Sequence, residues 1–508
     1  MENTSSHSKG QAHAYHSHEA STSNSSDLEV IDSPREDDPA LGLERNLSPR
    51  SNAAQTIYRV YKRRFFGLSQ LVLLNIVVSW DWLSFSPVSK TSAEYFATSE
   101  TAINWLSTSF LFSFCVASPF TIYSLNKTGP KGAIIVASCL LLVGNWIRYG
   151  GTRAGNFGAV MLGQILVGLA QPFVLSAPTR YSDVWFSAKG RVSATAVASL
   201  ANPFGGALAQ LINPLWASRP SDIPNMILYV SIICTIACVP SFFIPSAPPT
   251  PPSASAASHT QLNNTHSSSS AITRTLITSL HNLLTSVPNL LIILPFWTYV
   301  ALFNSSSSLL NQFLYPYAYT ETQAGIAGAL LILVGLVSAA LSSPLIDRYK
   351  FYLLYIKITV PLIALSYLVF IWAPESRTLV YPYVVLSVLG AASFGLVPVA
   401  LEFLVEISYP LGPEVGSTVC WTGGQFWGGL FIIIENALKA DEGAGPPLHM
   451  HRALVFQAVV AMLIVPAPLW LGFRGARVVR RRLEVDKGDI EGEREGNLVG
   501  GREGGTMI

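Results

Sequence analysis

Long apolar stretches, separated by short connectors that hold much of the charge, constrain this chain more than any other feature. About 20 apolar residues in a row cross the hydrocarbon core of a membrane as a helix, because lipid offers no partner to unpaired backbone groups. Charged residues make up only 12% of the 508 residues, whereas a soluble chain typically has about 25%. We therefore predict an all-α membrane protein with about twelve transmembrane helices.

The apolar stretches fall into two groups of six. The first six helices are expected at about 66–87, 101–124, 132–150, 157–178, 192–215 and 224–244. The second six are expected at about 288–315, 323–345, 352–372, 380–405, 415–438 and 452–473. Six helices, a polar linker and six more helices are typical of a carrier built from two pseudosymmetric halves.

The same pattern divides the chain into five segments. The expected halves are residues 58–244 and 288–473, joined by a Ser/Pro-rich linker at 245–287. The N-terminal tail 1–57 is polar and is expected to be disordered, since it cannot bury enough apolar surface to offset chain entropy. The tail 474–508 is polar, charged and Gly-rich.

The positions of Lys and Arg predict the orientation of the chain. Basic residues gather before the first helix, after the second, fourth and eighth, and after the twelfth, as at Arg63, Lys127, Arg348 and Arg480. Connectors rich in Lys and Arg stay on the cytoplasmic side of a membrane. We therefore expect a multi-pass protein with both termini and the linker in the cytoplasm, in the plasma membrane or in a vacuolar or lysosomal membrane.

Several classes of protein are not supported by the sequence. A net charge of +2 without a basic stripe gives no sign of nucleic-acid binding. The five cysteines lie in apolar stretches without metal-binding or disulfide spacing. No catalytic motif is evident, so we expect neither an enzyme nor a cofactor. The expected partners are a small-molecule solute and the lipid bilayer, and the chain is expected to act as a monomer.

Asp81 lies between Trp80 and Trp82 in the first predicted helix. A charged side chain in a membrane helix costs several kcal/mol unless it faces a cavity or a partner. Beside an indole ring, the carboxylate would suit an organic cation through charge and cation–π attraction, or it would bind and release a proton. Alternatively, Asp81 lies near the outer interface with Lys90 as its partner. The residues alone leave these interpretations open.

Polar residues also interrupt the fourth, seventh and eleventh predicted helices. Gln164 and Gln171 are seven apart and share a helix face. The stretch FNSSSSLLNQF, which contains Asn304, suggests a broken helix lining an aqueous path, and Gln425 lies in the Gly-rich stretch GGQFWGG. Such breaks at matching places in two halves point to a central site. The alternative is hydrogen bonding between helices.

Three charged residues suggest a gate or a coupling site at the cytoplasmic ends of the fourth and tenth helices. Glu402 and Glu406 are four apart and share a face, and Arg180 ends the fourth helix. An ion pair between Arg180 and Glu406 would close a cytoplasmic gate if its energy differs between two states. The alternative is that Glu402 accepts a proton.

Several blocks resemble the feline leukaemia virus subgroup C receptor-related family of major facilitator carriers. They are NWLSTSFLFSF, GQILVGLAQPFVLSAPTRYSDVWF, VSATAVASLANPFGG, LLNQF and EFLVEISYP with GGQFWGG. The resemblance covers about residues 60–475 and omits the tails and the linker. It implies a major facilitator fold, alternating access and a small organic solute of choline, ethanolamine, haem or pyridoxine type.

The resemblance also implies a set of binding residues. In choline-carrying members the site contains a tryptophan, two glutamines and a tyrosine, which match Trp82, Gln171, Gln425 and Asn304 here. Asparagine replaces the tyrosine and removes one wall of an aromatic cage. Asp81 would supply charge in compensation, which is an inference from this sequence and not a family feature.

We therefore predict a secondary transporter of a small polar or cationic organic solute. Facilitated diffusion needs no titrating residue, whereas proton coupling would use Asp81, Glu402 or Glu406. A membrane receptor or nutrient sensor that binds without transporting is the alternative function.

Overall fold

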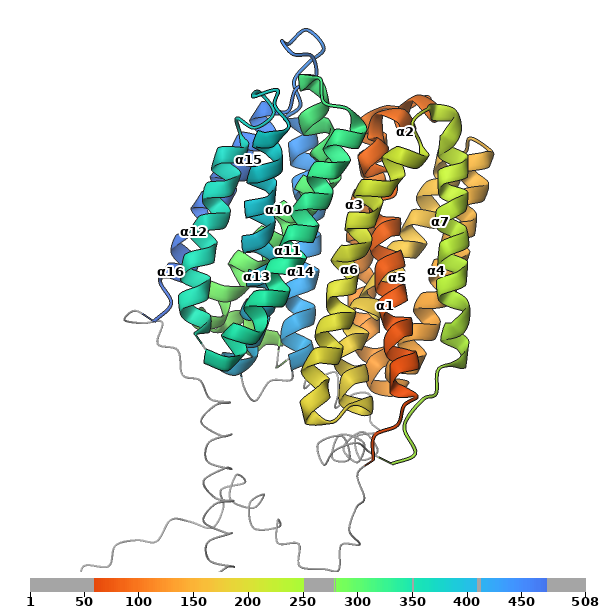
Figure 1. Cartoon of the computed structure of the whole chain (residues 1–508), viewed down its shortest axis with the longest axis vertical. Coiled ribbons are helices and arrows are strands. Elements are labelled where there is room, and N and C mark those ends of the chain that lie inside the picture. Colours follow the sequence, from red (N-terminus) through yellow and green to blue (C-terminus); the bar gives the residue numbers. More distant parts are fainter. Residues whose placement is uncertain (1–58, 251–277, 279, 350, 409–412, 473–508) are drawn as a thin grey trace, which may run out of the picture. The chain divides into compact units, whose positions relative to one another are not determined.

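The computed structural model describes residues 59–250, 278, 280–349, 351–408 and 413–472. Every regular element within these residues is a helix (Figure 1). The predicted tails at 1–57 and 474–508 and much of the predicted linker lie outside the described residues.

The helices of residues 64–243, here called the N-terminal bundle, overlap all six predicted apolar stretches and add a short helix at 89–95. They are α1 (Arg64–Trp82), α2 (Ser89–Tyr95), α3 (Glu100–Lys127), α4 (Gly129–Arg153), α5 (Phe157–Trp185), α6 (Ala188–Trp216) and α7 (Ile223–Cys238), with short 3-10 turns η1 (Ser86–Val88), η2 (Pro220–Asp222) and η3 (Val239–Phe243). Polar caps fix some of the starts: the side chain of Ser99 accepts from the backbone of Ala102, and Asn156 does the same at α5.

The helices of residues 287–469 form the C-terminal bundle. They are α10 (Val287–Leu314), α11 (Glu321–Tyr349), α12 (Tyr352–Phe370), α13 (Val380–Ser408), α14 (Pro413–Ala437), α15 (His451–Leu463) and α16 (Pro466–Leu469), with the turn η4 (Tyr315–Tyr317) after α10. The two bundles pair their helices in the same order. In the N-terminal bundle α1 packs on α6, and α5 packs on α3 and α4; in the C-terminal bundle α10 packs on α14, and α13 packs on α11 and α12.

Ten helices within the described residues are long and apolar enough to cross a membrane. The helices α6 and α14 are 29 and 25 residues long, but α6 contains the stretch ANPFGG and α14 the stretch GGQFWGG. The fold is therefore an all-helical bundle suited to a bilayer, and the number of twelve transmembrane helices stays a prediction.

The predicted break in the seventh helix is wrong. α10 is continuous from Val287 to Leu314, and Ser305, Ser306, Ser307 and Ser308 are all buried within it. The hydroxyl groups of Ser305 and Ser306 and the carbonyl of Ser307 bond to other helices, so the polar run joins helices in an unbroken helix. The first and last predicted helices end earlier than expected, at Trp82 and Leu463, where a turn leads into η1 and α16.

Contacts between the bundles run along α3 with α14 and α6 with α11. Close approach of helices depends on glycine at some points: a Cβ on Gly205 would overlap the carbonyl oxygen of Ile76 in α1, and one on Gly390 would overlap that of Leu331 in α11. Small residues at such crossings let membrane helices pack tightly. In Figure 1 the N-terminal bundle (red to yellow-green) and the C-terminal bundle (green to blue) lie side by side.

Candidate functional site

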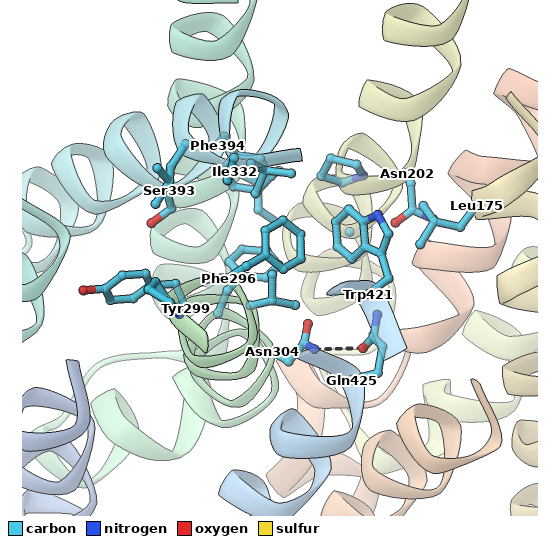
Figure 2. Close-up of a pocket in the computed structure, with 18 of the residues that line it drawn as sticks. Leu175, Asn202, Phe296, Tyr299, Asn304, Ile332, Ser393, Phe394, Trp421 and Gln425 are labelled. Atoms are coloured by element: carbon cyan, nitrogen blue, oxygen red, sulfur yellow. Dashed lines mark hydrogen bonds between the residues drawn. The ribbon is translucent and has the colours of Figure 1, made fainter. Parts of the chain in front are cut away.

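A pocket lies between the two bundles at mid-length of the helices. It holds about 1000 Å³ of space, part of which is open to solvent. Its walls come from α1, α5 and α6 on one side and from α10, α11, α12, α13 and α14 on the other. Figure 2 shows side chains of both bundles around it, among them Asn202 and Leu175 from the N-terminal bundle and Phe296, Trp421 and Gln425 from the C-terminal one.

Six aromatic side chains line the pocket among mostly aliphatic ones, and together they are called the aromatic wall here. Trp82 stacks on Phe110, with ring centroids 6.2 Å apart, and Trp421 meets Phe296 edge-on at 5.4 Å. Tyr299 also lines the pocket, while its hydroxyl donates to the carbonyl oxygen of Ala461 at 3.2 Å. Packing against neighbouring rings holds these side chains in place, so the wall presents fixed aromatic surface to an occupant.

Asn304 and Gln425 form a hydrogen-bonded amide pair on one side of the pocket, here called the pocket floor. The amide nitrogen of Asn304 donates to Oε1 of Gln425 at 2.8 Å (Figure 2). Gly428 makes room for this pair, because a Cβ there would lie 2.8 Å from the same amide nitrogen. The bond joins α10 to α14 and orients both amides at the pocket.

Two further polar atoms at the pocket are buried without a hydrogen bond among the described residues. They are Nε1 of Trp82 and Oε1 of Gln171, and both residues line the pocket. A buried polar group without a partner costs about 1–3 kcal/mol. Trp82 and Gln171 therefore each carry a polar atom whose hydrogen-bonding capacity is unused among the described residues.

Asp81 does not line the pocket. Its side chain is fully buried on the far side of α1, where Oδ1 lies 2.9 Å from Nη1 of Arg148 and Oδ2 accepts from Asn145 at 2.6 Å. The alternative partner Lys90 instead contacts Tyr315 and lies 4.0 Å from Glu94. The charge of Asp81 is therefore balanced by a basic residue of α4, and Asp81 is not among the residues that line the pocket.

Gln164 also lies behind the wall. Its amide nitrogen donates weakly to the carbonyl oxygens of Asp81 and Trp82, at 3.3 and 3.4 Å. Gln171 is at the pocket and Gln164 is not, so only one of the two glutamines on the shared face reaches it. The contacts of Gln164 hold the end of α1 against α5 and so position Trp82.

Polar contacts join the bundles at one end of the pocket. Lys439 of the C-terminal bundle pairs with Glu100 of α3, and Thr91 donates to Glu321 at 2.6 Å. The Gln312 amide donates to Asn104 at 2.7 Å. These bonds close the end at which α1, α10 and α14 finish, opposite the end at which they begin.

The three predicted gate residues lie near the other end. Arg180 is half-buried close to the end of α5, and Glu402 and Glu406 are close to the end of α13, where Glu406 is buried. Their role as a gate stays a prediction.

Two buried charged residues were not singled out from the sequence. Arg148 in α4 and Glu435 in α14 are both fully buried. The available signal was a charge inside an apolar run, NWIRYGG for the arginine and FIIIEN for the glutamate. Both lie near the predicted ends of their helices, where a long side chain is expected to reach water.

Comparisons with known proteins agree with this architecture. The family model described as Major Facilitator Superfamily matches residues 71–431. The chain is 30% identical to "Solute carrier family 49 member A3" of Xenopus tropicalis over 430 residues, covering 82% of this chain and 87% of that relative. It is 27% identical to "Choline/ethanolamine transporter FLVCR1" of Felis catus over 389 residues, covering 75% and 68%.

Solved structures show the same fold at low sequence identity. A bacterial homologue of the human lysosomal transporter Spinster, described as inward-facing and unoccupied, superposes with a TM-score of 0.61 at 12% identity, covering 81% of this chain and 97% of that one. The xylose transporter XylE from E. coli, in a partially occluded inward-open conformation, gives 0.60 at 13% identity, covering 82% and 99%.

The fold and the pocket between two bundles define a transporter of the major facilitator type. The chain belongs to the Major Facilitator Superfamily, and within it to the feline leukaemia virus subgroup C receptor-related family indicated by the sequence.

Proposed function

We propose that this chain carries a small polar or cationic organic solute of choline or ethanolamine type, by alternating access of the pocket between the two bundles. The observation that carries the proposal is the pocket itself. Its lining includes six aromatic side chains, an amide pair lies on its floor, and Trp82 and Gln171 each have a polar side-chain atom without a hydrogen bond among the described residues.

The chemistry of the wall favours a solute with a weakly hydrated cationic or polar head. The described lining contains no Asp or Glu, so a cation would be held by the faces of Trp82, Trp421 and Phe296 and by amide oxygens. Cation–π contacts contribute about 0.5–2 kcal/mol each and hold quaternary ammonium groups without a formal counter-ion. Relatives described as choline/ethanolamine transporters support the same class.

We further propose that the chain has twelve transmembrane helices with both termini in the cytoplasm. In that orientation the contacts of Lys439 and Thr91 close the outer end, and the pocket would open to the cytoplasm. Arg180 and Glu406, at the other end, would then approach each other as the outer end opens. Such an exchange of contacts biases the two states only if each pair differs in free energy between them.

Uptake into proteoliposomes tests the proposal directly. We expect uptake of radiolabelled choline or ethanolamine by wild-type protein and its loss in Gln425→Ala, which removes the amide bond to Asn304. Trp427→Ala is the matched control, because Trp427 lies on the same helix but is 41% exposed and outside the pocket lining.

The test also separates the carrier from a receptor. If the protein binds radiolabelled choline without taking it up, a receptor or nutrient sensor is favoured. If it binds neither choline nor ethanolamine, solutes of this type are excluded.

A further inference from the structure

Glu435 is a buried acidic residue that the proposed pocket does not use. It lies in α14, ten residues beyond Gln425, and its side chain is fully buried. Oε1 accepts from the hydroxyl of Ser305 at 2.8 Å, and Oε2 accepts from the amide of Gln457 at 2.9 Å. The amide of Gln457 also contacts Ser305 at 3.3 Å, so three helices meet at this carboxyl group.

No basic side chain pairs with Glu435 within the described part of the chain. The facing groups are neutral: Ser305 from α10, Gln457 from α15 and the phenol of Tyr367 from α12. Lys439 follows one turn later, after the end of α14, but pairs with Glu100. An ionised carboxylate buried in a membrane without a cation costs several kcal/mol. The site therefore requires a proton or another cation.

The position of Glu435 links the pocket to the closed end. On one side, Ser305 follows Asn304, whose amide bonds to Gln425 at the pocket floor. On the other side, Asn436 accepts a hydrogen bond from Asn104 of the N-terminal bundle at 3.0 Å. The carboxyl group thus lies between the residues that contact the solute space and those that join the bundles.

We propose that Glu435 is the proton-binding site of this carrier, an inference that rests on the proposed transport function. With the bundles joined at this end, the carboxyl group is sealed from that side and holds its proton, with Ser305 and Gln457 as its hydrogen-bond partners. When α3 and α14 separate, water reaches Glu435 and the proton leaves to that side. A proton that is bound with different free energy in the two states couples a pH gradient to the movement of the bundles.

Infrared spectroscopy of the reconstituted full-length protein tests proton binding without any solute. We expect a carboxylic-acid carbonyl band at about neutral pH in wild-type protein, where exposed carboxyl groups are ionised. The band should disappear in Glu435→Gln and remain in Glu442→Gln, which makes the same change at an exposed position. If the band is absent in wild-type protein, or persists in Glu435→Gln, the proposal is overturned.

Two further measurements address a variant that does not fold and a cation other than the proton. If Glu435→Gln does not fold, a shifted band in Glu435→Asp decides the assignment, because that variant keeps a titrating group in the same place. The second measurement compares the thermal stability of the protein in sodium chloride and in potassium chloride. If sodium stabilises wild-type protein but not Glu435→Asp, and wild-type protein shows no acid band, Glu435 binds a metal cation and the proposed proton site is overturned.

Uptake of radiolabelled choline across a pH gradient distinguishes failure of this proposal from failure of the proposed function. If one proton is coupled, choline uptake changes by at most about tenfold per unit of pH difference across the membrane. We expect this change to fall to within about twofold in Glu435→Gln. If choline uptake by wild-type protein is independent of pH, the proposed transport function is retained and the proposed proton site is rejected. If Glu435 gives an acid band but choline is not taken up, the proton site is retained and choline is rejected as the solute.

Discussion

The buried ion pair between Asp81 and Arg148 allows a quantitative prediction. Neither side chain is exposed, and their closest atoms are 2.9 Å apart. Removing one partner from a buried pair leaves an uncompensated charge, which typically costs about 3–5 kcal/mol. We therefore expect Asp81→Asn and Arg148→Met each to lower the free energy of unfolding by an amount in or near this range.

The contacts around the pair predict that the two losses differ. Arg148 has Nε and Nη2 without a described partner, and its one other bond, to Asn145, is 3.4 Å long. A guanidinium group cannot lose its proton in a protein, so Asp81→Asn leaves a buried positive charge and should cost about 4–5 kcal/mol. Asp81 keeps its bond to Asn145 and can take up a proton, so Arg148→Met should cost about 3 kcal/mol.

The double variant completes the test. With both charges gone, the loss in Asp81→Asn with Arg148→Met should be smaller than that of either single variant, by about 1–3 kcal/mol. The measurement is unfolding in detergent by SDS titration, with the midpoint of thermal unfolding as a second readout. Glu94→Gln is the control, because its pair with Lys90 is 4.0 Å long and exposed, and should cost less than about 1 kcal/mol. Additive losses, or an Asp81→Asn variant as stable as the control, would show that the two charges do not stabilise each other.

Three further predictions concern the pocket and its closed end. Trp82→Ala should raise the choline concentration for half-maximal uptake about tenfold, because an aromatic face that contributes about 1–2 kcal/mol is lost. Trp82→Phe keeps an aromatic ring and should raise this concentration less. Gly428→Ala should reduce choline uptake at least about threefold by displacing the amide pair of the pocket floor, a loss of about 0.5–1 kcal/mol typical of one hydrogen bond. Gly443→Ala, with open space around it, should leave uptake and expression unchanged, and equal effects of the two substitutions would contradict this reading. Lys439→Gln should break the pair with Glu100 and increase labelling of a cysteine placed in the closed end, measured with a membrane-impermeant maleimide; unchanged labelling would show that this pair does not hold the end closed.

The helices and their order were predictable from the sequence because the apolar stretches and their polar punctuation are local features. The family resemblance added four residues, Trp82, Gln171, Asn304 and Gln425, and the structure brings all four to one pocket. The sequence alone placed them on separate helices and gave no distance between them.

Partners across helices were not predictable in the same way. Asp81 and Arg148 are 67 positions apart, and the rotation of α1 and α4 that brings them together depends on packing around the whole bundle. The stretch FNSSSSLLNQF in α10 is unusually polar, and this polarity predicted a broken helix lining an aqueous path. Instead Glu435, Gln457 and Gln210, from three other helices, bond to its serines, and none of these is near it in sequence.

The two buried acidic residues, Asp81 and Glu435, show why the identity of the neighbours decides function here. Both are fully buried, and in sequence each is a single carboxylate in an apolar stretch. Asp81 has a permanent positive charge beside it, so its ionised form is balanced and its role is to hold α1 and α4 together behind Trp82. Among the described residues, Glu435 has only neutral donors beside it, so the balance must come from a mobile cation. The acidic residue nearest the aromatic wall in sequence is therefore the structural one, and the residue suited to proton coupling lies a few turns beyond the pocket on α14.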